Sequence, residues 1–144
     1  MTRLQCRLDL PANYRAKDVL ALHRRDPAAL AEAVTENTLR KGLIWQGRPA
    51  CFTITFANDF ALAGLAVDGA FAAHDKLADL QILVMRMLGL QQHIGEFERR
   101  FADHAQLGTL LAAQSGLRVP QAASTFEALT WAITGQQISL HAAI

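Results

Sequence analysis

The pattern of hydrophobic and polar positions changes its period near the middle of the chain. In residues 3–10 hydrophobic and polar side chains alternate. A period of two predicts a β-strand with one buried face. The alternation returns between about residues 30 and 67, and from residue 75 hydrophobic residues recur at helical spacing. The sequence therefore predicts a sheet-forming first half and a helical second half.

The first half is predicted to form a small antiparallel α+β unit. The stretch PANYRAKDVLALHRRDP favours a short helix that ends before Pro27. TLRKGLIWQG and PACFTITFA favour two strands joined by a turn at Gly47-Arg48-Pro49, and FALAGLAVDG favours one more. Four or five strands with one helix packed across them form such a unit, which we assign to residues 1–72.

The second half, residues 73–144, is predicted to form an incomplete helical domain. Residues 75–90 carry a helical pattern that ends at Gly89. Two further helical patterns follow, and the second closes at Gly116, a residue type that often ends helices. The segment LRVPQAAS then connects to one more helix.

That last helix has a clear start signal. Ser124 and Glu127 form a capping box, in which each side chain accepts a hydrogen bond from a free backbone N–H. On a helical projection, one line of hydrophobic residues faces the expected core, and Gln137 falls on the same line. The hydrophobic members of this line are Phe126, Ile133, Leu140 and Ile144.

A pair of glutamines, Gln136 and Gln137, interrupts this line. In a continuous helix Gln137 would be buried, and each unsatisfied polar group would cost about 1–3 kcal/mol. Gly135 is a poor helix former and Ser139 a good N-cap, so the helix can instead end near Gln136 and a second helix can begin at Ser139. We favour the broken helix, with the glutamines at an exposed tip.

The chain stops only a few residues into that expected second helix, at Ile144. An isolated helix of that length is unstable in water. We therefore expect the sequence to be part of a longer protein.

Composition limits the other classes of function. Hydrophobic residues make up 51% of the chain, charged residues 19%, and the net charge is +1. A basic surface would have to be local. The pairs Arg24-Arg25 and Arg40-Lys41 are either solvated surface or phosphate contacts.

We expect no metal site, no cofactor and no membrane-spanning segment. The two cysteines, Cys6 and Cys51, are far apart and are expected to be reduced, and the five histidines have no zinc-site spacing. The N-terminus lacks the apolar core of a signal peptide, and no apolar stretch reaches the roughly 18 residues of a membrane span. We expect a cytoplasmic protein.

The segment GLRVPQAASTFEALTWAITGQQISLHAA resembles the bacterial 3-methyladenine-DNA glycosylase II family, within the helix-hairpin-helix DNA glycosylases. The order of a small sheet domain followed by helices matches this family too. The resemblance covers nearly the whole chain, but its specificity is concentrated in the last 30 or so residues. It implies a TATA-binding-protein-like N-terminal domain, followed by the first helices of an all-α catalytic domain.

The resemblance implies DNA base-excision repair. Members of the family bind double-stranded DNA, flip an alkylated purine such as 3-methyladenine out of the stack and hydrolyse its N-glycosidic bond. The family's catalytic aspartate and glycine-rich hairpin would lie beyond Ile144, so the resemblance assigns no catalytic residue here. The implied full-length enzyme is a monomer, and these 144 residues alone are expected to be inactive.

The resemblance also assigns DNA-binding and pocket positions. It places the side chain that fills the hole left by the flipped base at Gln137, supported by Gln136 and Ser139. Leu22 matches a position where some members carry an aromatic residue facing the pocket. Trp131 is either a core residue, which we favour, or a second pocket residue.

Two rival functions follow from the same residues. The first is a non-catalytic DNA- or protein-binding module that kept the scaffold. The second, a small-molecule α+β enzyme, has no nucleophile–base, phosphate-loop or metal pattern to support it.

Overall fold

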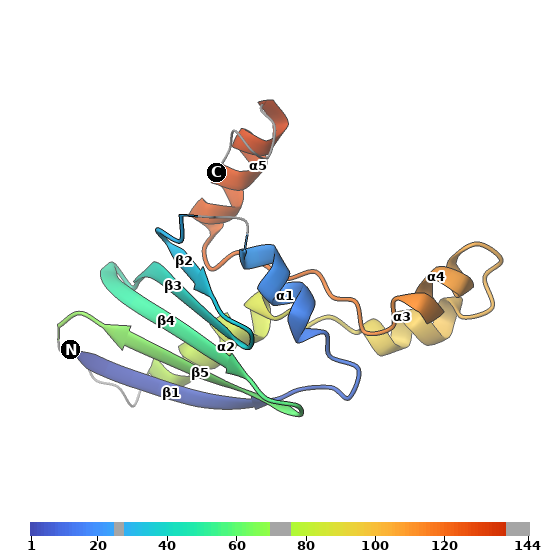
Figure 1. Ribbon diagram of the computed structural model, residues 1–144, viewed down its shortest axis with the longest axis horizontal. Coiled ribbons are helices and arrows are strands. Elements are labelled where there is room, and N and C mark those ends of the chain that lie inside the picture. The colour runs from blue at the N-terminus through green and yellow to red at the C-terminus, as the bar shows by residue number, and fades with distance from the viewer. Residues whose placement is uncertain (25–27, 70–75, 138–144) are drawn as a thin grey trace.

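The computed structural model describes residues 1–24, 28–69 and 76–137, which form one sheet and a series of helices (Figure 1). The strands are β1 Thr2–Asp9, β2 Glu32–Val34, β3 Thr38–Trp45, β4 Arg48–Phe56 and β5 Phe60–Val67. The helices are α1 Ala16–His23, α2 Leu77–Met87, α3 Ile94–Phe101, α4 Leu107–Ala113 and α5 Thr125–Gln137.

The five strands form one antiparallel sheet in the order β1-β5-β4-β3-β2. This confirms the predicted α+β class. The connection after β1 carries α1 and leads to the opposite edge, where β2 begins. That edge strand has only three residues, which leaves little free edge for another chain to pair with.

The hydrophobic core lies on one face of the sheet. The alternation predicted for β1 places Leu4 inside, and Phe52 of β4 and Leu65 of β5 lie on the same face. Leu20 of α1 and Leu80 of α2 complete this core, and all five side chains are at most 5% exposed. Two helices far apart in sequence therefore cover the same face of the sheet.

The hairpin between β3 and β4 turns earlier than predicted. Trp45 pairs with Arg48, so the loop consists of Gln46 and Gly47 alone. Both residues have positive φ, 48° and 77°, as a two-residue hairpin turn with mirror-image geometry requires. Arg48 and Pro49, which we had placed in the turn, already belong to β4. The right-handed twist of the paired strands favours this tight loop over the three-residue turn.

Gly89 ends α2 as predicted. Its φ is 65°, its N–H bonds the carbonyl of Arg86 at 3.0 Å, and the N–H of Leu90 bonds that of Met85 at 2.8 Å. This pair of bonds satisfies carbonyls at the end of the helix. The chain then continues away from the sheet to α3 (Figure 1).

The division at residues 72 and 73 stays a prediction. The helix that follows it, α2, packs into the sheet core through Leu80, Leu83, Val84 and Met87. By contrast, α3 and α4 extend away from the sheet, and α5 rises from the end where β2 and β3 lie (Figure 1). In the described segments no helix is long and apolar enough to span a bilayer.

Candidate functional site

Helix α5, which carries the predicted site residues, begins at a well-formed cap. The Glu127 N–H donates to the Ser124 hydroxyl oxygen at 3.1 Å. Oε2 of Glu127 accepts a hydrogen bond from the Ala123 N–H, also at 3.1 Å, rather than from Ser124 as the predicted capping box requires. The start of the helix was predicted correctly, and the carboxylate reaches one residue further back.

The glutamine pair lies at the other end of α5. Gly135, Gln136 and Gln137 all have helical backbone, and the side chain of Gln136 is exposed. Ser139 and the predicted second helix lie outside the described residues. The break between two helices therefore stays a prediction.

The hydrophobic line of α5 faces solvent. Phe126 is 81% exposed, Leu129 56% and Ile133 65%. We had expected Phe126 and Ile133 to face a core, but within the described chain no element covers them. Side chains three and seven positions apart share one helical face, so these residues form a continuous apolar stripe.

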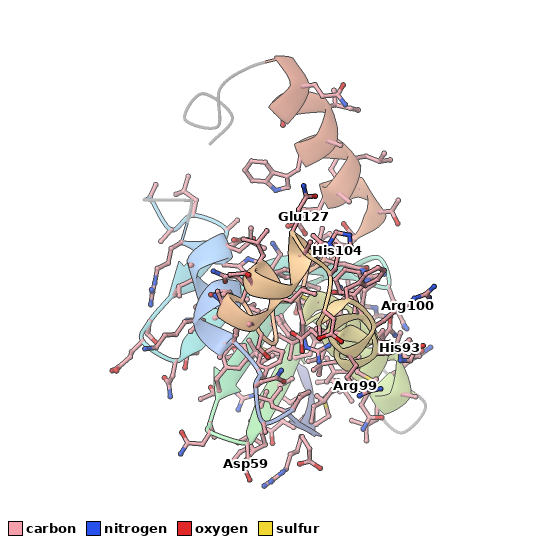
Figure 2. The ribbon with its side chains drawn as sticks, turned by 90° about the vertical axis from the view of Figure 1, so that its right-hand side faces the viewer. Asp59, His93, Arg99, Arg100, His104 and Glu127 are labelled. Atoms are coloured by element: carbon pink, nitrogen blue, oxygen red, sulfur yellow. The ribbon has the colours of Figure 1, made fainter. Side chains whose placement is uncertain are left out.

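A chain of ionic contacts joins α5 to the sheet. Nζ of Lys41, on the inner face of β3, lies 2.7 Å from Oε1 of Glu127 and contacts Oε1 of Glu32 in β2. Oε2 of Glu32 lies 2.8 Å from Nδ1 of His23, at the end of α1. Figure 2 shows Glu127 at the base of α5, beside the rest of the chain. Four elements, α1, β2, β3 and α5, therefore meet at one set of charges.

This ionic cluster, defined as His23, Glu32, Lys41 and Glu127, is largely shielded from water. The side chain of Lys41 is 6% exposed and that of Glu32 12%. Burial alone would raise the pKa of Glu32, but hydrogen bonds from His23 and Lys41, together with their charges, outweigh it and lower the pKa to about 2. Glu32 is therefore an anion at neutral pH, and it neutralises the buried ammonium.

A groove of about 810 Å³ opens beside the cluster, between β3, α2 and the start of α5. Its lining is mainly apolar, from Trp45, Ile82 and Phe126 among others, and it also includes Lys41 and Glu127. Among the described residues, the buried indole N–H of Trp45 has no hydrogen-bond partner. The groove joins the sheet unit to the base of α5.

The connection that leads into α5 is held against α2. The Arg86 guanidinium donates to the Ala123 carbonyl at 2.6 Å, and the Gln121 N–H donates to the Met87 carbonyl at 3.3 Å. Further back, the Arg118 guanidinium donates to the carbonyls of Gly89 and Gln92, each at 3.0 Å. The connection is therefore held in place up to Ala123, just before α5.

The two predicted pocket residues lie apart from this groove. Leu22 on α1 and Trp131 on α5 are both half-buried, and neither lines the groove between β3 and α5. Their role in a base-binding pocket stays a prediction.

Lys41 is the residue that sequence reasoning misjudged. Neither alternative weighed for it, solvated surface or phosphate contact, holds, because its ammonium is buried between two carboxylates. The signal was in the sequence: Lys41 falls between Leu39 and Leu43 in the strand alternation, so its side chain points inward. A lysine at an inward position requires an acidic partner. Arg40, one position earlier, is exposed as expected.

Comparison with known proteins supports the predicted resemblance. A family model described as the AlkA N-terminal domain matches residues 5–124. The chain belongs to the AlkA N-terminal domain family. Among solved structures, a 3-methyladenine DNA-glycosylase from Archaeoglobus fulgidus shares the fold, with a TM-score of 0.72 and 20% sequence identity. Comparison with curated proteins gave no match.

The residue range that the family match covers ends close to the candidate site. The structural match covers 96% of this chain and 47% of the archaeal one, so the chain spans about half the length of that protein. The AlkA N-terminal domain match ends at residue 124, where α5 begins. The Lys41–Glu127 ion pair therefore links the matched domain to the helix that follows it.

Proposed function

We propose that this chain is the N-terminal part of a DNA N-glycosylase that removes alkylated purines such as 3-methyladenine in base-excision repair. The observation that carries the proposal is the match of residues 5–124 to the AlkA N-terminal domain. The archaeal structure that shares the fold is itself named a 3-methyladenine DNA-glycosylase. The enzyme would act as a cytoplasmic monomer on double-stranded DNA, without metal or cofactor.

In this proposal α5 delivers the residue that replaces the flipped base. Extruding a base leaves a gap in the stack and costs a few kcal/mol. A flat amide at the end of a helix can enter that gap, and its polar atoms can hydrogen-bond the unpaired partner base. Gln137 at the end of α5 has this chemistry, with Gln136 and Ser139 as its polar neighbours. Catalysis itself would fall to residues outside this sequence.

The proposal is tested with methylated duplex DNA. The complete gene product should release 3-methyladenine, and the 144-residue chain alone should not. Gln137→Ala in the complete protein should weaken binding to duplex DNA that contains an abasic site. Gln136→Ala is the matched control and should weaken this binding less. Release of the base by the short chain would refute the assignment of catalysis to residues outside it, and unchanged affinity of Gln137→Ala would refute the role of Gln137.

The apolar stripe on α5 favours a second candidate, a non-catalytic binding module. Phe126, Leu129 and Ile133 are exposed, so they are available to another helical segment of the same protein or to a partner protein. The continuation of the gene separates the two. A glycine-rich hairpin followed by an aspartate favours the glycosylase, and a stop codon favours the module.

A further inference from the structure

The carboxylate of Glu127, at the base of α5, contacts the sheet and has two functions. One oxygen of Glu127 caps the start of the helix through the Ala123 N–H, and the other lies 2.7 Å from the ammonium of Lys41. The same residue therefore fixes where α5 begins and attaches that start to β3. Since the apolar stripe of α5 is exposed, packing of that face does not orient the helix in the described chain.

Lys41, the anchor to which Glu127 is attached, has a well-fixed position in the sheet. Its Cα lies within a strand paired on both sides, opposite Phe52 of β4 and Glu32 of β2. Its side chain is 6% exposed, and its ammonium also contacts Glu32 of β2. A buried charge held by two carboxylates has few alternative positions, because any displacement leaves a charge unpaired.

A small change in the direction of α5 at its base moves the far end of the helix by a larger distance. At 1.5 Å per residue, about 15 Å of helix separates Glu127 from Gln137. A tilt of about 10° at the base would move the tip by about 2.6 Å, comparable to the roughly 3.4 Å between stacked base pairs. A side chain that has to enter a gap of that size tolerates little tilt.

We propose that Lys41 and Glu127 are positioning residues: their ion pair sets the direction of α5 and thereby places the glutamine tip against DNA. Neither residue contacts the DNA in this inference. The AlkA N-terminal domain would then contribute to base flipping by orienting the helix that follows it. The inference rests on the function proposed above for Gln137.

The test is a double-mutant cycle between the anchor and the tip, in the complete gene product. Lys41→Met, Gln137→Ala and the double variant are compared for affinity to duplex DNA that contains an abasic site. Lys41→Met alone should lower this affinity on the order of ten- to a hundredfold, because small misplacements are costly at such sites. In the Gln137→Ala background it should have little further effect. Lys41→Arg, which keeps the charge, should restore most of the affinity.

Further variants distinguish an effect on folding stability from an effect on the direction of α5. Glu127→Gln keeps an oxygen for the Ala123 N–H while removing the charge, and it serves where Lys41→Met does not fold. Leu39→Ala, on the same face of β3, destabilises the domain without touching the ion pair and should leave abasic-site affinity unchanged at a temperature where it is folded.

The possible outcomes are distinct. Equal losses from Lys41→Met in both backgrounds would overturn the positioning role while leaving Gln137 as the inserted residue. If Gln137→Ala alone has no effect, the proposed role of Gln137 fails, and the inference fails with it. Loss of affinity in Leu39→Ala equal to that in Lys41→Met would also overturn the inference.

Discussion

The ammonium of Lys41 lies 2.7 Å from the carboxylate of Glu127, although the two residues are 86 positions apart in the sequence. The pair joins the inner face of the sheet to the first turn of α5. It also completes a cluster in which the Lys41 ammonium contacts two carboxylates. The sheet unit and, in the positioning role proposed above, the direction of α5 therefore depend on the same charge.

Removing that charge should destabilise the domain. Lys41→Met removes the cation that Glu127 contacts and leaves Glu32 with His23 as its remaining partner in a largely buried site, which costs about 3 kcal/mol or more. Denaturant unfolding of the 144-residue chain measures the loss. Arg40→Met is the matched control, because the neighbouring side chain is exposed, and it should change stability by no more than about 0.5 kcal/mol. Equal effects of the two variants would contradict a structural role of the cluster.

The cluster should also make stability depend on pH in the acid range. The pKa of Glu32 is lowered from 4.5 to about 2 in the folded chain, so the folded state holds the anion more strongly than the unfolded state does. Its contribution is complete above pH 4.5 and is lost as the pH falls from there towards 2. The loss is on the order of 2–3 kcal/mol. Glu32→Gln should be less stable at neutral pH and should lack this part of the pH dependence, and parallel curves for the two proteins would contradict the prediction.

Two glycines should respond in opposite ways to alanine. At Gly116 φ is 77°, and a Cβ would lie 1.9 Å from the Asn13 carbonyl oxygen, so Gly116→Ala should cost about 1–3 kcal/mol and loosen the end of α4 from the loop before α1. At Gly135 a Cβ meets nothing within 4 Å, and the backbone is helical. Gly135→Ala should therefore stabilise α5 by about 0.5–1 kcal/mol. Thermal unfolding measures the first change and helical circular dichroism the second.

Loss of the N-cap should be visible locally in α5. Ser124→Ala removes the acceptor of the Glu127 N–H and should cost about 1 kcal/mol of helix stability. Amide hydrogen exchange in the first turn should accelerate several-fold, while exchange in β4, in the sheet core, stays unchanged. Ser124→Thr keeps an accepting oxygen and is the control. Unchanged exchange in Ser124→Ala would show that Ser124 does not act as the cap.

Much of the secondary structure followed from local pattern. Period-two alternation predicted β1 because a half-buried strand permits no other arrangement of its hydrophobic residues. The glycine at position 89 ended α2 because it can adopt positive φ at low cost. The hairpin turn was predicted too late in the chain, because Gly47-Arg48-Pro49 resembles a turn until the pairing of Trp45 with Arg48 fixes the register.

Some features of the candidate site were predicted from the sequence, and others are visible only in the structure. The sequence located the start of α5, because a cap acts over a few residues; the break at the glutamine pair stays a prediction. It gave no partner for Lys41, since Glu32 lies on an adjacent strand and Glu127 on a distant helix. It also placed Phe126 and Ile133 in a core, whereas in the described chain they are exposed.

The sequence by itself determined the periods, the start of α5 and the end of α2, because these depend on backbone conformation within a few positions of each residue. Only the tertiary structure decided which buried charges meet and which apolar face stays open, because both depend on contacts between segments far apart in the chain. The ion pair at the base of α5 is of the second kind. It joins the sheet domain to the first turn of α5, a contact that no local pattern could indicate.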